Sequence, residues 1–139
     1  MTYLIPEDFE TAIEADELEA IVDGSTTALN SAVEIAIDEA ISFIQGRKDM
    51  TATFAATGDE RNRLFVAMLV DIALYHLCRI SPRNIPDLRR DRYAEAIAFL
   101  RGVAKNTRFL DIPNTPTNEG EGGSGYIVWG STPNYDFFG

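Results

Sequence analysis

The side chains best suited to nucleophilic or metal chemistry are scarce in this chain of 139 residues. It has one histidine, His76, and one cysteine, Cys78. Residues two apart in a helix point in different directions, so these side chains do not form a prepared nucleophile and base. A single cysteine also excludes an internal disulfide framework and a cysteine-based zinc site. We therefore expect His76 to be a core or interface residue.

The carboxylates offer little more catalytic potential. Asp71 lies within an apolar stretch, and a buried carboxylate has to be paired. We expect an arginine of the last predicted helix to be the partner of Asp71, in a structural role. The acidic pairs Asp38 with Glu39 and Glu17 with Glu19 are expected on solvated faces, without the geometry to share a ligand with a histidine.

No short motif with a chemical mechanism is present. The sequence lacks the spacings of phosphate-binding loops, dinucleotide-binding turns, zinc proteases, serine hydrolases and EF-hands. The glycines between 120 and 125 do not connect a strand to a helix, so they do not indicate a phosphate loop. We expect no catalytic, metal-ligating or cofactor-binding residues, and no enzymatic activity.

The charge is more informative than the motifs. Asp and Glu number 22 against 12 Lys and Arg, which gives a net charge of −10 and excludes sequence-independent DNA binding. Residues 1–46 hold eleven acidic and no basic residues, whereas residues 79–108 hold eight basic and three acidic ones. Such asymmetry suits head-to-tail self-association. The simpler interpretation is that each cluster is a solvated helix face.

The length and composition are those of one globular domain. Hydrophobic residues make up 45% of the chain, enough for a core without disulfides or metals. No apolar run is long enough to span a membrane. The opening MTYLIPEDFE has neither the positive charge nor the apolar stretch of a signal peptide. These features favour a protein of a reducing cytosol.

Hydrophobic periodicity predicts an all-α bundle of four to five helices with an extended C-terminal tail. The clearest pattern runs from residue 25 or 26 to 45, where apolar residues alternate at spacings of three and one. A helical turn is predicted from Pro6, and further helices over 16–22, 59–80 and 87–105. Residues 47–58 are predicted to be a loop. The helix over 59–80 is apolar almost all round, so we expect burial on several sides, one of them against another subunit.

The composition changes after Asn106, which predicts two parts: a helical domain over 1–106 and a tail over 107–139. The tail begins with a spacer rich in proline and glycine and ends in GYIVWGSTPNYDFFG. Aromatic residues dominate interface hot spots, so a spacer with an aromatic end is suited to holding a partner. The alternative is that the tail folds back over an apolar helix of its own chain. The residues predicted for partner or oligomer contacts are Tyr126, Ile127, Val128, Trp129, Tyr135, Phe137, Phe138, Arg89, Arg92 and Arg101.

The order of these signals resembles a known family. An acidic entry, TYLIPEDFETAI, precedes IDEAISFIQGR, VDIALYHL and RYAEAIAFLRGVAK. This pattern, over residues 3–112, resembles the head–tail connector proteins of tailed phages, also called adaptor or head-completion proteins, in their small Mu-like prophage type. Two segments depart from the usual pattern: RKDMTATFAATGDE stands in place of a proline-rich stretch, and the aromatic tail is longer.

The resemblance implies a virion protein at the head–tail interface, made in the host bacterial cytoplasm. It implies a ring of copies under the portal protein that matches the portal's symmetry of about twelve and extends the DNA channel. The implied partners are the portal, neighbouring copies and a downstream tail or stopper protein. Genome DNA would pass without specific binding, and no membrane or cofactor is implied.

Two other functions remain open from the sequence. An acidic regulator, such as a DNA mimic that occupies a basic nucleic-acid-binding protein, would share the negative charge but would give the aromatic tail no role. A small cytosolic enzyme with a site between subunits is the third possibility, although no residues indicate one. Assembly with a portal protein separates the first function from the other two.

Overall fold

The computed structural model describes residues 3–22, 26–80 and 85–115, and its regular elements in these ranges are all helices, with no strand. The all-α prediction is therefore confirmed. The α-helices are α1 (Ala15–Val22), α2 (Thr26–Ile44), α3 (Met50–Ala55), α4 (Arg63–Ile80) and α5 (Asp87–Ala104). Two short 3₁₀ helices, η1 (Pro6–Thr11) and η2 (Gly58–Glu60), precede α1 and α4.

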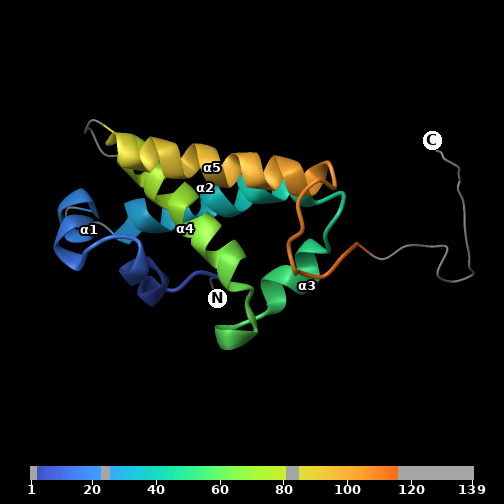
Figure 1. The fold of residues 1–139 in the computed structure, drawn as a ribbon. Coiled ribbons are helices and arrows are strands. Elements are labelled where there is room, and N and C mark those ends of the chain that lie inside the picture. Colours follow the sequence, from blue (N-terminus) through green and yellow to red (C-terminus); the bar gives the residue numbers. More distant parts are fainter. Residues whose placement is uncertain (1–2, 23–25, 81–84, 116–139) are drawn as a thin grey trace, which may run out of the picture.

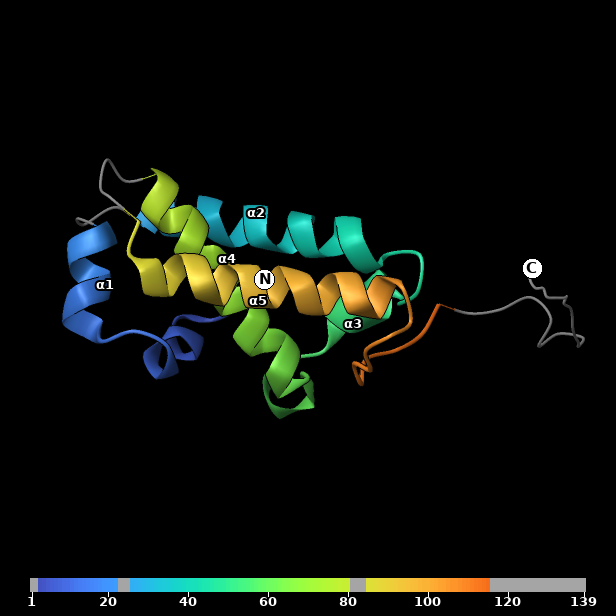
Figure 2. The ribbon, with the colours of Figure 1, turned by 45° about the horizontal axis from the view of Figure 1, so that its top comes forward.

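Three long helices form the body of the molecule. α2 and α5 run alongside each other in the same direction, and α4 crosses them (Figures 1 and 2). The stripe predicted on α2 is the face that packs: Ala32, Ala36 and Ala40 are fully buried against the other helices. Small residues on this stripe let helix axes approach closely, which increases dispersion contacts.

α4 is the central helix, as its apolar sequence predicted. Ten of its residues are buried, including Phe65, Leu69 and Leu77. The chain supplies most of this cover itself, because η1, α1, α2 and α5 all pack on α4. Exposed apolar side chains remain at the two ends of the helix, where Leu64 is 48% and Ile80 is 45% exposed.

The segment between α2 and α4 differs from its prediction. Residues 47–58 were expected to form a loop, but they contain α3. The Asp49 side chain caps this helix by accepting a 3.0 Å hydrogen bond from the backbone N–H of Ala52. The start of α4 also lies later than predicted. Asn62, not Asp59, supplies the cap, because its Oδ1 accepts a 2.8 Å hydrogen bond from the Phe65 N–H.

The chain after α5 folds back onto the body instead of leaving it at residue 107. Leu110 is 1% and Ile112 is 8% exposed, so both belong to the core. Lys48 holds this segment through hydrogen bonds from its Nζ to the Leu110 carbonyl (2.8 Å) and to Asn114 Oδ1 (2.7 Å). The predicted boundary at 106/107 therefore does not coincide with the end of the packed chain, which continues to Thr115.

Candidate interaction surfaces

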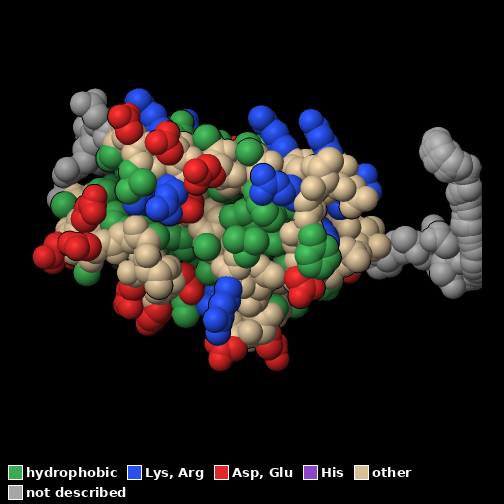
Figure 3. All heavy atoms as spheres, in the orientation of Figure 1, with side chains coloured by type: hydrophobic (Ala, Val, Ile, Leu, Met, Phe, Trp, Pro, Cys, Tyr) green, Lys and Arg blue, Asp and Glu red, His purple; other side chains and the backbone are tan. Residues whose placement is uncertain are grey.

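The acidic residues of the N-terminal segment gather at one end of the molecule. Residues 5–22 contain seven carboxylates and no basic side chain. η1 and α1 place them at the end remote from the C-terminus of α5, where red side chains are seen in Figure 3. We call the exposed members of this group the acidic end: Glu7, Glu10, Glu14, Asp16, Glu17 and Glu19.

The seventh carboxylate, Asp8, fixes this end to the body. The Arg61 guanidinium contacts both Asp8 oxygens, at 2.6 and 3.0 Å, and also donates to the Tyr3 carbonyl at 2.9 Å. Both charged side chains are nearly covered, at 11% and 10% exposed. Burial by itself raises the pKa of Asp8, but the hydrogen bonds from Arg61 and from the Ile5 N–H outweigh it and hold the pKa below its usual range.

Arg89 is a second attachment of the acidic end. Its side chain is inside the molecule, at 7% exposed, and its Nη2 donates to the carbonyl of Ala12, between η1 and α1. Its Nη1 is buried without a hydrogen-bond partner among the described residues. In the single chain Arg89 thus positions the acidic segment on α5, and its part in an interface between copies stays a prediction.

The opposite end of the molecule is basic. Arg101, Lys105 and Arg108 follow one another with no acidic residue between them, and Arg47 joins them by donating from Nε to the Ala104 carbonyl at 3.0 Å. All four are exposed, and blue side chains stand above the C-terminal half of α5 in Figure 3. Arg47, Arg101, Lys105 and Arg108 are called the basic end. Arg92, also predicted for contacts, is exposed farther back on α5.

Two of these cations lie over aromatic rings, which limits their freedom. The guanidinium carbon of Arg101 is 5.5 Å from the centre of the Phe43 ring, and that of Arg108 is 5.1 Å from the Phe99 ring. Cation–π contacts of this kind hold the charge at the surface while the aliphatic stem covers apolar area. The basic end is therefore a partly ordered charged surface.

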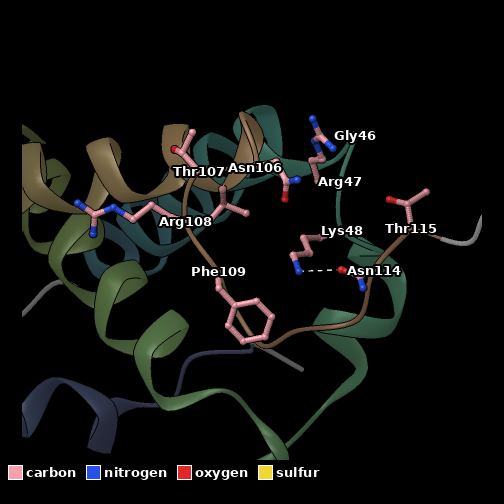
Figure 4. A pocket seen from close by; sticks show the side chains of 10 residues that line it. Gly46, Arg47, Lys48, Asn106, Thr107, Arg108, Phe109, Asn114 and Thr115 are labelled. Carbon is pink, nitrogen blue, oxygen red and sulfur yellow. Dashed lines mark hydrogen bonds between the residues drawn. The ribbon is translucent and has the colours of Figure 1, made fainter. Parts of the chain in front are cut away.

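A cavity of about 690 Å³ opens at the basic end, between the turn after α2 and the chain after α5 (Figure 4). Lys48 points toward it, but its ammonium group is already used by Leu110, Asn114 and the Ile112 carbonyl at 3.4 Å. A saturated ammonium group has no donor left for a ligand. The exposed aromatic side chain at this hollow is Phe109, which is 79% exposed.

A second hollow, of about 470 Å³, lies between α4 and α5. Its apolar wall includes Leu64 and Met68 from α4 and Phe99 from α5, and the charged residues Glu95 and Arg108 also line it. Apolar side chains gather between these two helices on the face drawn in Figure 3. Asp71 and Arg92 also line it. We call this hollow the α4–α5 groove.

Asp71 is half-buried in that groove. Burial raises the pKa of its carboxyl, and the charges of Arg92 and Arg89 act in the opposite direction. These two arginines are both on α5, the helix from which the sequence predicted a paired partner for Asp71. Within the described ranges, however, no ion pair or hydrogen bond reaches its carboxylate.

His76 lies in a buried polar network that joins three helices. Its Nε2 is 2.7 Å from Glu39 Oε1, and Arg79 donates from Nη1 to His76 Nδ1 at 2.9 Å. The Tyr93 hydroxyl donates to Glu39 Oε2 at 2.6 Å, and the Tyr93 ring stacks on Tyr75 with centres 3.9 Å apart. A guanidinium group has only donors, so His76 Nδ1 is the acceptor in the contact with Arg79.

This network corrects one prediction. Glu39 is not on a solvated face without histidine neighbours, because its side chain is 25% exposed and bonded to His76. The α2 pattern predicts the burial of Ala36 and Ala40, and Glu39 lies beside this stripe. The sequence signal that could have located the network is the placement of Tyr93 and His76 on the apolar faces of their own helices.

The tail residues predicted for partner contacts lie outside the described residues. They are Tyr126, Ile127, Val128, Trp129, Tyr135, Phe137 and Phe138. Within the part of the chain that is described, no three His, Cys, Asp or Glu side chains are grouped so that they could hold a metal ion. No described helix is both long and apolar enough to cross a membrane.

Comparison with known proteins gives one match. A family model described as Bacteriophage Mu, Gp36 matches residues 3–128. The match extends through every described helix and ends at Val128 in the first part of the aromatic segment. No curated protein and no solved structure matches the chain.

Proposed function

This chain belongs to the Bacteriophage Mu Gp36 family, and from that premise we propose that it is the structural head–tail connector of a Mu-like phage or prophage. Copies of the chain form a ring under the portal protein, extend the DNA channel and present a platform to a tail or stopper protein. The chain is then a virion component at the head–tail interface, and its work is assembly, not catalysis.

The observation that carries the proposal is the separation of charge along the body. The acidic end and the basic end lie at opposite ends of the described structure (Figures 1 and 2). A ring requires heterologous contacts, in which one surface meets a different surface of the next copy. Surfaces of opposite sign at opposite ends favour such head-to-tail contacts and disfavour the contact of like ends.

The net charge supports the channel part of the proposal. A conduit must pass DNA without retaining it, and a chain of net charge −10 repels phosphates. Contacts between the acidic end of one copy and the basic end of the next would also neutralise the basic residues. The assembled ring would then be more uniformly acidic than the single chain.

The alternative of an acidic regulator is less well supported. A DNA mimic needs carboxylates distributed over a surface that replaces the phosphates of a duplex. Here six exposed carboxylates are grouped at the acidic end, other exposed carboxylates are spread along the body, and four exposed cations form the basic end. A partner of uniformly basic charge would meet repulsion at that second end.

The proposal is tested by mixing the purified chain with the portal protein of the same genome. Mass measurement in solution should give a complex in which the number of chains equals the number of portal subunits. A portal protein from an unrelated phage is the control for unspecific association. If the chain stays a free small species beside its own portal, the connector function is wrong.

A further inference from the structure

The α4–α5 groove has the form of a site for an aromatic side chain. Its volume of about 470 Å³ lies within the range in which small organic groups are enclosed. The wall residue Leu64 is 48% exposed although it is large and apolar. Such a side chain gains free energy when a partner covers it. The groove is therefore an apolar surface that gains free energy from an occupant.

The same groove is lined by two carboxylates, the half-buried Asp71 and the exposed Glu95. In the described part of the chain the Asp71 carboxylate receives no hydrogen bond from a protein group. A half-buried carboxylate gains from a donor that reaches it inside the groove. An occupant that matches the groove has a flat apolar body and a single N–H or O–H group, which is the chemistry of tryptophan and tyrosine.

The chain itself carries such an occupant close by. Thr115 lines the cavity at the basic end, and Arg108 lines both that cavity and the groove. Residues 116–125 can span at most about 35 Å, whereas α5, with 18 residues, is about 27 Å long. The segment 126–129, Tyr-Ile-Val-Trp, is therefore within reach of the groove of its own chain.

The covalent connection through residues 116–125 also determines whether the segment binds the groove of its own chain or the groove of another copy. A short tether gives the tethered segment an effective concentration in the millimolar range. A separate copy at ordinary protein concentrations competes poorly with that value. The favoured occupant is the segment of the same chain.

We propose that residues 126–129 dock in the α4–α5 groove of their own chain, with the indole of Trp129 against Leu64 and Phe99 and its N–H donated to Asp71. The aromatic segment is then covered in the free protein. A partner that takes the segment must release it from the groove, so that docking restrains the tail before assembly. This inference concerns the free chain and does not depend on the connector function.

Trp129 is the only tryptophan, so its fluorescence reports on the segment directly. The full chain in buffer should emit at shorter wavelength, and be less accessible to acrylamide, than the same chain unfolded in urea. Leu64→Glu should move the emission most of the way to the unfolded value. Leu88→Glu is the matched control, since Leu88 is 50% exposed and lies outside the groove. Asp71→Ala should weaken docking by about tenfold, the effect of losing one hydrogen bond to a charged acceptor.

Each alternative outcome is decisive. Circular dichroism of every variant first establishes that the helices are retained. An emission that shifts to longer wavelength on dilution would assign the segment to a neighbouring copy and overturn docking within the chain. A solvent-exposed Trp129 in the intact chain, or equal effects of Leu64→Glu and Leu88→Glu, would overturn the groove assignment. None of these results requires the portal, so they stand apart from the test of the proposed function.

Discussion

Asp8 in η1 and Arg61 before α4 form a two-point ion pair, with nitrogen–oxygen distances of 2.6 and 3.0 Å. The pair is nearly covered by the surrounding chain. It joins the N-terminal acidic segment to the start of the central helix. The position of the acidic end therefore depends on this charged contact between residues 53 apart in sequence, together with the contact of Arg89 with Ala12.

Removal of this pair should destabilise the protein in a pH-dependent way. Asp8→Asn should lower the free energy of unfolding by about 2 kcal/mol at pH 7, since a covered guanidinium loses its charged acceptor. The pKa of Asp8 is lowered in the folded state, so its contribution is present above the unfolded pKa of about 4 and is lost as pH falls through the folded value. Urea unfolding at pH 7 and at pH 3 measures the free energy of unfolding at each pH.

The expected pattern is a large difference between wild type and Asp8→Asn at pH 7 and a smaller one at pH 3. Glu10→Gln, an exposed change in the same 3₁₀ helix, is the control and should have little effect at either pH. Equal differences at the two pH values would show that the Asp8 charge does not contribute.

The bond between Glu39 and Tyr93 gives a second prediction. Tyr93→Phe should cost about 1–2 kcal/mol, because a partly buried carboxylate loses one of its two donors. Tyr75→Phe keeps the stacked ring pair and leaves this hydrogen bond in place, so it should cost less. Chemical denaturation of the three proteins compares them, and equal losses in the two variants would contradict the assigned role of the Tyr93 hydroxyl.

The same tyrosine should resist ionisation. Burial, followed by the hydrogen bond to Glu39, raises the pKa of Tyr93 well above its ordinary value. The folded state then keeps the Tyr93 proton above pH 10 while the unfolded state releases it, so this residue makes stability fall as pH rises beyond about 10. Ultraviolet titration of the folded protein should show a late-titrating tyrosine signal that decreases in Tyr93→Phe, beside the signal of Tyr3, whose pKa burial also raises. A titration curve unchanged by that substitution would contradict the raised pKa of Tyr93.

Gly102 gives a prediction whose sign is opposite to ordinary helix propensity. A Cβ at this position would collide with Arg108 Cγ, because the chain after α5 turns back over the helix here. Gly102→Ala should therefore destabilise the protein by about 1–3 kcal/mol, although alanine is favoured by about 1 kcal/mol in an open helix. Gly46→Ala meets no atom within 4 Å and serves as the control. Thermal unfolding distinguishes the two, and a stabilised Gly102→Ala would mean that the 107–115 segment does not pack as described.

The head-to-tail contact can be tested by exchange of charge. Reversal at the basic end (Arg101→Glu with Lys105→Glu) should reduce ring formation on the portal, as should reversal at the acidic end (Glu17→Lys with Glu19→Lys). The two altered ends are complementary again, so a chain with all four changes should recover part of the assembly. Glu60→Lys, on η2 away from both ends, is the matched control. Absence of recovery, with each variant folded, would indicate that these ends do not meet.

The sequence predicted the long helices well because their signal is local. The spacing of Ala32, Ala36 and Ala40 determines a buried face without knowledge of any partner. The capped helix α3 was missed because six residues give too short a period to detect, and its evidence was the single side chain of Asp49. A helix of this length is determined by one capping hydrogen bond and not by a repeated apolar face.

The surfaces were less predictable because they depend on contacts between distant residues. In the sequence Arg89 belongs to a basic run that is expected at the surface. In the structure its side chain lies inside the molecule, where it donates a hydrogen bond to the carbonyl of Ala12. The Lys48 ammonium group similarly donates a hydrogen bond to the carbonyl of Leu110, a residue that composition alone assigned to the tail. Charge segregation along the chain could be read from the sequence, but the placement of the two charged groups at opposite ends required the path of α5.

Electron microscopy of the chain bound to the portal protein of its own genome tests the central claim most directly. We expect a ring stacked coaxially on the portal, with one chain per portal subunit. In this ring the η1–α1 end of each copy lies against the Arg101–Arg108 end of the next. A portal particle with no added ring, or a ring in which like ends meet, would contradict it.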